Sequence, residues 1–232
     1  MWRAVLLLLC TLLPIAACAG NGDDAPVSAN STAHRFLALG DSYTIGESVA
    51  ARERWPVGLT ALLAAEGIEV HAPQIIARTG WTTAELAAGV EEANLDGPYY
   101  LVSLLIGVND QYRGLSSERY REEFRALLAQ AVGFAGGAPS RVIVLSIPDW
   151  GVTPFAEGRD RALIGREIDA FNAINREEAA SVGARYVDIV AVSREAATDP
   201  ALTATDGLHP SGELYRRWAG LALPEARAAL VR

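Results

Sequence analysis

Lysine is missing from this chain: all 20 positions that carry Lys or Arg are arginine. Three kinds of site depend on a lysine side chain, namely the phosphate-binding P-loop, the Schiff base of a pyridoxal phosphate enzyme and the serine–lysine hydrolase site. The sequence therefore excludes all three. The abundance of alanine and arginine indicates a GC-rich genome as the source of this bias, and the exclusions hold whatever its cause.

Runs of basic residues are also missing, and the formal net charge of the chain is −8. Proteins that bind nucleic acid gather positive charge on one surface, so we expect no nucleic-acid partner. The chain has 232 residues, of which 50% are apolar. This is enough for one domain with a substantial core, with or without an appendage.

Cysteine is scarce, and both cysteines, Cys10 and Cys18, lie near the start of the chain. Arg3 precedes a nearly continuous aliphatic run over residues 5–13, which is too short to span a membrane comfortably. Small residues follow this run, and the pattern predicts a signal peptide over residues 1–17. The segment Ile-Ala-Ala-Cys that ends at Cys18 resembles a bacterial lipobox, in which the cysteine becomes the lipid-modified N-terminus.

Processing at this point would leave Cys18 as the sole cysteine, so no intrachain disulfide could form in the oxidising compartment. We expect an exported protein that a lipid on Cys18 anchors to the bacterial cell envelope, at the outer membrane and periplasm or at the cell surface. A secreted protein with an incidental Cys18 is the alternative. Residues 18–34 are polar and predict a flexible tether, which assigns residues 35–232 to the folded domain.

Short apolar runs alternate with helical patterns throughout this domain. Strands are expected at residues 36–39, 68–77, 99–106, 141–147 and 185–190. Helices are expected at residues 55–66, 82–93, 116–132, 160–181 and from 211 onward, with Pro224 breaking or kinking the last one. The alternation predicts an α/β protein with a doubly wound parallel sheet, whose ligand site lies beyond the carboxyl ends of the strands.

Ser42 directly follows the first expected strand, in Gly-Asp-Ser-Tyr, although the G-x-S-x-G motif of many α/β-hydrolases is absent. A serine in such a turn is most often an N-cap. The sequence has 3 histidines. His34 lies in the tether and His71 at a strand edge, which leaves His209 as the candidate catalytic imidazole. Asp206 is close enough to hold its Nδ1–H, an arrangement suited to nucleophilic acyl transfer.

A carboxylate and a histidine could also hold a metal ion. The domain offers no second suitable histidine and no cysteine, so we expect neither a metal nor a cofactor. Acyl transfer further needs donors for a developing oxyanion. Gly80 and Asn109 both follow expected strands and are candidates for this role.

These segments resemble, in order, the four sequence blocks of the SGNH/GDSL hydrolase superfamily. The resemblance implies that Ser42 is the nucleophile, His209 its base and Asp206 the residue that orients His209. It implies an oxyanion hole formed by the Ser42 amide, Gly80 and Asn109. It also implies a flavodoxin-like three-layer sandwich with a five-stranded parallel sheet, and catalysis without a metal.

Tyr43 stands where many members have leucine, a departure that affects the pocket and leaves the mechanism intact. Four aromatic residues near the strand ends are candidates for lining a substrate pocket, with packing of the loops as the alternative: Tyr43, Trp81, Tyr112 and Trp150. No segment reads as a long lid, which favours short-acyl or carbohydrate esters.

We therefore expect a serine esterase that acts on a small-molecule, glycan or lipid ester. A lysophospholipase or thioesterase, an O-acyltransferase and a binding lipoprotein that has lost catalysis are the alternatives.

Overall fold

The computed structural model describes Met1 and residues 33–231. The chain divides into two units, residues 1–31 and 32–232, and the description below concerns the second. The predicted signal peptide and the lipidation of Cys18 lie outside the described residues.

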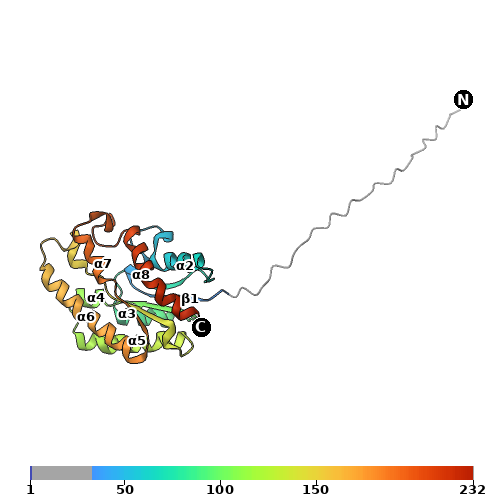
Figure 1. The fold of residues 1–232 in the computed structure, drawn as a ribbon, viewed down its shortest axis with the longest axis horizontal. Coiled ribbons are helices and arrows are strands. Elements are labelled where there is room, and N and C mark those ends of the chain that lie inside the picture. Colours follow the sequence, from blue (N-terminus) through green and yellow to red (C-terminus); the bar gives the residue numbers. More distant parts are fainter. Residues whose placement is uncertain (2–32, 232) are drawn as a thin grey trace. The chain divides into compact units, whose positions relative to one another are not determined.

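Five parallel strands form one sheet (Figure 1). Their order is β2-β1-β3-β4-β5. The strands are β1 (Phe36–Gly40), β2 (Gln74–Ala77), β3 (Leu101–Leu105), β4 (Val142–Leu145) and β5 (Arg185–Val187). Every residue of β1, β3 and β4 is buried, as expected for central strands that helices cover on both faces. The predicted five-stranded α/β fold is confirmed.

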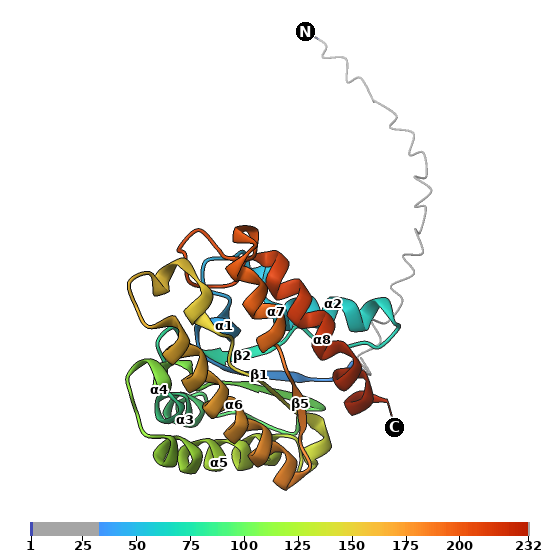
Figure 2. The same ribbon diagram turned by 60° about the vertical axis from the view of Figure 1, so that its left-hand side comes forward.

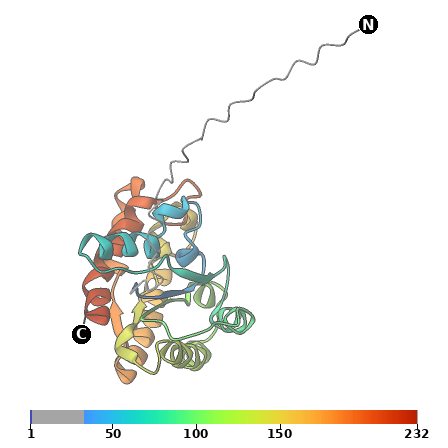
Figure 3. The ribbon, with the colours of Figure 1, turned by 90° about the vertical axis from the view of Figure 1, so that its right-hand side faces the viewer.

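Helices form a layer on each side of this sheet (Figures 2 and 3). One layer contains α2 (Trp55–Ala65) and α8 (Gly212–Leu230), which pack against each other. The other contains α3 (Thr83–Glu92), α5 (Ser117–Phe134) and α6 (Arg161–Val182). Helix α2, in the connection from β1 to β2, and α8, the last helix, thus share one face of the sheet. The reason is that this right-handed connection runs along the sheet in the opposite direction to the later ones.

Local signals define several helix boundaries. Thr82 and Glu85 form a capping box at the start of α3, and Ser116 caps α5, both as the sequence predicts. Strand β2 is shorter than the predicted 68–77 and begins after Pro73, which has no N–H to donate to the sheet. Helix α8 continues through Pro224, so of the two predicted outcomes, a break or a kink, the break is wrong. Burial of its alanine-rich face against α2 and the sheet offsets the lost hydrogen bond.

Short helices occupy the connections that the sequence suggests are loops. The α-helical ones are α1 (Ser42–Ile45), α4 (Val108–Tyr112) and α7 (Val190–Arg194). The 3₁₀ turns are η1 (Ala51–Glu53), η2 (Pro139–Arg141), η3 (Trp150–Val152), η4 (Pro154–Ala156), η5 (Glu195–Ala197) and η6 (Pro200–Leu202). Several of these follow strand ends and therefore border the edge where the predicted site lies. Within the described part of the chain, no helix combines the length and the apolar character needed to cross a membrane.

Candidate active site

Ser42 is the first residue of α1, at the carboxyl end of β1. Asp41 caps this helix, and its carboxylate accepts a hydrogen bond from the Tyr43 amide at 3.0 Å. Glycine is required at position 40, just before Asp41, because a Cβ there would collide with the Thr44 hydroxyl and with a backbone carbonyl of β3. The side chain of Ser42 is buried, with 5% of the residue exposed.

Two buried carboxyl groups, of Asp41 in this turn and of Asp110 in α4, interact electrostatically. Complete burial raises the pKa of Asp41 to about 8, against the opposing effect of the Tyr43 amide. Burial also raises the pKa of Asp110 to about 6, although the amide and hydroxyl of Thr83 both donate to its carboxylate. At neutral pH Asp41 is therefore mostly protonated, which limits the negative charge next to Ser42.

Asp206 and His209 form a hydrogen-bonded pair. The Oδ2 atom of Asp206 lies 2.6 Å from Nδ1 of His209, and this distance fits a carboxylate that holds the imidazole in one tautomer. The other oxygen, Oδ1, accepts from the amides of Leu208 at 2.9 Å and of His209 at 3.0 Å. The ring of Tyr43 packs edge-on against His209, with 5.5 Å between the ring centroids.

Ser48 is a member of this site that the sequence patterns did not single out. Its hydroxyl donates to Oδ2 of Asp206 at 2.6 Å across 158 residues of sequence. Partial burial raises the pKa of the Asp206 carboxyl, but hydrogen bonds from Ser48, a backbone amide and His209 outweigh this and hold the pKa well below its usual range. No local sequence signal marks Ser48, because its partner is distant in the chain.

Asn109 lies in α4, at the carboxyl end of β3, and its amide is fixed in orientation. One N–H of Nδ2 donates to the Trp81 carbonyl at 2.9 Å, which leaves the second N–H for another acceptor. Gly80 has a left-handed backbone with φ of 85°, and its carbonyl accepts from the guanidinium of Arg113 at 2.6 Å. Arg113 ends the α4 segment, so this contact joins the Gly80 and Asn109 loops.

A cavity of about 160 Å³ brings Ser42, Asn109 and His209 together. Its remaining lining is largely apolar and aromatic: Tyr43, Val108, Tyr112, Trp150, Phe155 and Leu208. Three of the predicted pocket residues, Tyr43, Tyr112 and Trp150, thus line the cavity that contains the predicted nucleophile and base.

Gly80 and Trp81 are not in this lining. The Trp81 ring packs on Gly89 of α3, where a Cβ would collide with it. This differs from the expectation that Trp81 lines a pocket, and the reason is that Gly89 leaves room for the ring between the loop and α3. The oxyanion role of Gly80 stays a prediction.

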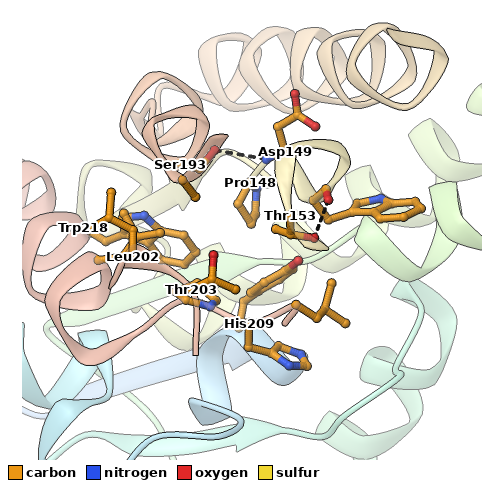
Figure 4. Close-up of a pocket in the computed structure, with 14 residues that line it drawn as sticks. Pro148, Asp149, Thr153, Ser193, Leu202, Thr203, His209 and Trp218 are labelled. Carbon is orange, nitrogen blue, oxygen red and sulfur yellow. Dashed lines mark hydrogen bonds between the residues drawn. The ribbon is translucent and has the colours of Figure 1, made fainter. Parts of the chain in front are cut away.

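A second cavity shares His209 and Tyr43 with the first and is otherwise lined by residues that include some of η3, α7 and α8 (Figure 4). In Figure 4 the imidazole of His209 points away from Pro148 and Asp149. The volume of this cavity is about 10 Å³, the scale of a single water molecule. The cavity of about 160 Å³, which Ser42 and Asn109 also line, is therefore the candidate substrate site. Among residues 33–231, no group of three or more His, Cys, Asp or Glu side chains could hold a metal ion.

This arrangement, with a serine, a histidine–aspartate pair and an asparagine amide at the carboxyl edge of a parallel sheet, defines a class of α/β hydrolases. The chain belongs to the GDSL-like Lipase/Acylhydrolase family, whose model matches residues 38–217. The predicted membership of the SGNH/GDSL superfamily is confirmed, and the protein is an ester-bond hydrolase.

Solved structures share this fold. TesA has a TM-score of 0.66 and 21% identity, covering 84% of this chain and 99% of TesA. The acetylxylan esterase Axe2 from Geobacillus stearothermophilus has a TM-score of 0.62 and 22% identity, covering 83% and 94%. The esterase EstA from Pseudoalteromonas sp. has a TM-score of 0.61 and 17% identity, covering 84% and 97%. The comparison with curated proteins gave no match.

Proposed function

We propose that this hydrolase is a serine esterase that cleaves carboxylic esters through a Ser42–His209–Asp206 acyl-enzyme mechanism. One observation carries the proposal: Ser42 and His209 line the same cavity, while Asp206 holds Nδ1 of His209 at 2.6 Å. The base is thereby oriented with its free Nε2 available to the nucleophile.

The reaction has two halves. His209 accepts the hydroxyl proton of Ser42 as Oγ attacks the ester carbonyl, and then donates that proton to the departing alcohol. Water next attacks the acyl-serine, again with His209 as the base. Asp206 stays ionised throughout and stabilises the imidazolium that forms in each half.

The tetrahedral intermediates carry a negative oxygen that needs hydrogen-bond donors. The second N–H of the Asn109 amide and the Ser42 backbone amide supply two, and Gly80 supplies a third. Each such donor contributes roughly 3 kcal/mol to stabilising the transition state. The contact between Asn109 and the Trp81 carbonyl fixes the amide before the reaction starts, so little reorganisation is needed.

The cavity favours a compact acyl group. Its volume of about 160 Å³ is below the roughly 300 Å³ at which drug-sized ligand pockets begin. Tyr112 and Phe155 line this cavity and are 47% and 40% exposed, so they could support a sugar ring on the alcohol side of the ester. Acetyl and other short-acyl esters, including those of carbohydrates, fit these features.

A series of p-nitrophenyl esters tests the acyl preference. We expect kcat/KM for the acetyl ester to exceed that for the palmitoyl ester by at least about tenfold, because the cavity cannot enclose a long chain. A preference for the palmitoyl ester would contradict the short-acyl assignment and favour the lysophospholipase or thioesterase alternative.

Tyr112 and Tyr100 provide a matched pair for the alcohol side, with similar exposures of 47% and 43%. Tyr112 lines the cavity, whereas Tyr100 precedes β3 at the opposite edge of the sheet. With an acetylated oligosaccharide, Tyr112→Ala should raise KM about fivefold and Tyr100→Ala should not change it. Equal effects would exclude sugar stacking on Tyr112.

We also propose that Cys18 carries a lipid that anchors the mature protein to the cell envelope. The support is the lipobox-like segment before Cys18 and the absence of a second cysteine beyond it. Globomycin should make the unprocessed precursor accumulate, and Cys18→Ser should block lipid labelling while Cys10→Ser leaves it intact. Normal processing in globomycin, or labelling of the Cys18→Ser variant, would refute the anchor.

A further inference from the structure

One of the four hydrogen-bond donors to the Asp206 carboxylate comes from outside its own loop. Three of its donors are local: the amides of Leu208 and His209 and the ring of His209. The fourth is the Ser48 hydroxyl, at 2.6 Å from the same Oδ2 atom that holds the histidine. Ser48 thus acts on the oxygen that determines where the imidazole lies.

Ser48 belongs to the segment that follows the nucleophile helix. We define residues 46–50, between α1 and η1, as the 46–50 loop. The loop begins at Gly46, whose amide donates to the Ser42 carbonyl at 3.0 Å. It is therefore attached at one end to the nucleophile and, through Ser48, to the carboxylate that orients the base.

The same loop also contacts the Gly80 segment. The Thr79 hydroxyl donates to the carboxylate of Glu47. Glu47 directly precedes Ser48 in the sequence, and Thr79 directly precedes Gly80. Two adjacent residues of the 46–50 loop therefore hold the Gly80 segment and the Asp206–His209 loop, which are two of the loops that the mechanism needs. Such cross-links restrict the relative motion of groups that must align within about 0.5 Å.

The backbone of Ser48 is unusual. Its φ is 64°, in the left-handed region, and Asn94 is the other described non-glycine residue with a positive φ. This conformation is unfavourable for a residue with a Cβ, and asparagine tolerates it better than serine. Ser48 is also exposed, so burial does not explain the choice of side chain. The contact that does explain a hydroxyl here is the hydrogen bond to Asp206.

We propose that Ser48 is a positioning residue that fixes the Asp206 carboxylate, and through it the His209 ring, relative to Ser42. Ser48 is not in the lining of the substrate cavity, so it acts on catalysis without touching the substrate. Without this donor, the carboxylate retains its Oδ1 contacts but Oδ2 loses one of its two partners. This inference rests on the proposed function of the Ser42–His209–Asp206 set.

Two substitutions of Ser48 distinguish the effect of losing the hydroxyl from the effect of relieving the backbone strain. Ser48→Ala removes the hydroxyl and keeps the strained conformation, whereas Ser48→Gly removes both. We expect both variants to lose about tenfold in kcat on p-nitrophenyl acetate with KM within twofold of wild type, because a hydrogen bond to a charged group is lost. Asn94→Ala serves as the control at a second left-handed position, remote from the site, and should keep full activity.

A double-mutant cycle with Asp206→Asn tests whether Ser48 acts through Asp206. In the Asp206→Asn background, Ser48→Ala should cause no further loss of kcat. A similar loss in both backgrounds, full activity of either Ser48 variant, or a change confined to KM would overturn the proposal. Ser42→Ala is assayed in parallel: if it retains turnover, the proposed mechanism fails and the Ser48 proposal fails with it. If Ser42→Ala is inactive and Ser48→Ala is unaffected, only the Ser48 proposal fails.

Discussion

Replacement of Ser42 or His209 by alanine should reduce the hydrolysis of p-nitrophenyl acetate by about 10⁴-fold or more. Ser42→Ala removes the atom that forms the acyl-enzyme, and His209→Ala removes the group that accepts its proton. The two losses should not add in the double variant, because each alone stops the same step. Initial rates with purified protein measure the effect, and a fluorophosphonate probe should label the wild type and not the Ser42→Ala variant.

Matched controls separate chemistry from folding. Ser117→Ala, at the start of α5, and His71→Ala, which precedes β2, change the same residue types outside the cavity. Both should keep wild-type turnover, and all four variants should show native circular dichroism. Near-wild-type rates for Ser42→Ala would contradict the acyl-enzyme mechanism. A wild-type protein without turnover would favour the binding lipoprotein instead.

Asp206→Asn should reduce kcat by about 10⁴-fold with little change in KM. An asparagine amide can present an N–H to Nδ1 of His209, which stabilises the tautomer whose Nε2 already carries a proton and cannot act as a base. The variant also loses the negative charge that stabilises the imidazolium. The carbonyl oxygen of asparagine can still accept from the Leu208 amide, so the loop should keep its shape.

Asp199 offers a close control for this substitution. Its carboxylate accepts from the backbone amide two residues further on, at 3.0 Å, as Asp206 does from Leu208 at 2.9 Å. Asp199 caps η6 and does not line the substrate cavity. Asp199→Asn should keep full activity; a comparable loss at both positions would indicate that loop stability, and not the tautomer of His209, determines the rate.

Local chemistry explains why the sequence predicted so much of the fold. The strands are apolar runs bounded by turn residues, and the helices carry their own caps, as Thr82 and Ser116 show. Such signals need no knowledge of distant contacts. Packing overrode a local signal at Pro224, through which α8 continues. At β2 the apolar pattern predicted too long a strand, because it ignored the missing N–H of Pro73.

The sequence by itself determined the order and spacing of the segments that contain Ser42, Gly80, Asn109 and the Asp206–His209 pair. The first three follow strands whose pattern is readable locally, and Asp206 and His209 lie in one short loop before α8. Only the tertiary structure decided which side chains share a cavity. It placed Trp81 on Gly89, away from that cavity, and it brought Ser48 to Asp206 across 158 residues. Contacts of this kind depend on how the sheet and its helices pack, so no local pattern encodes them.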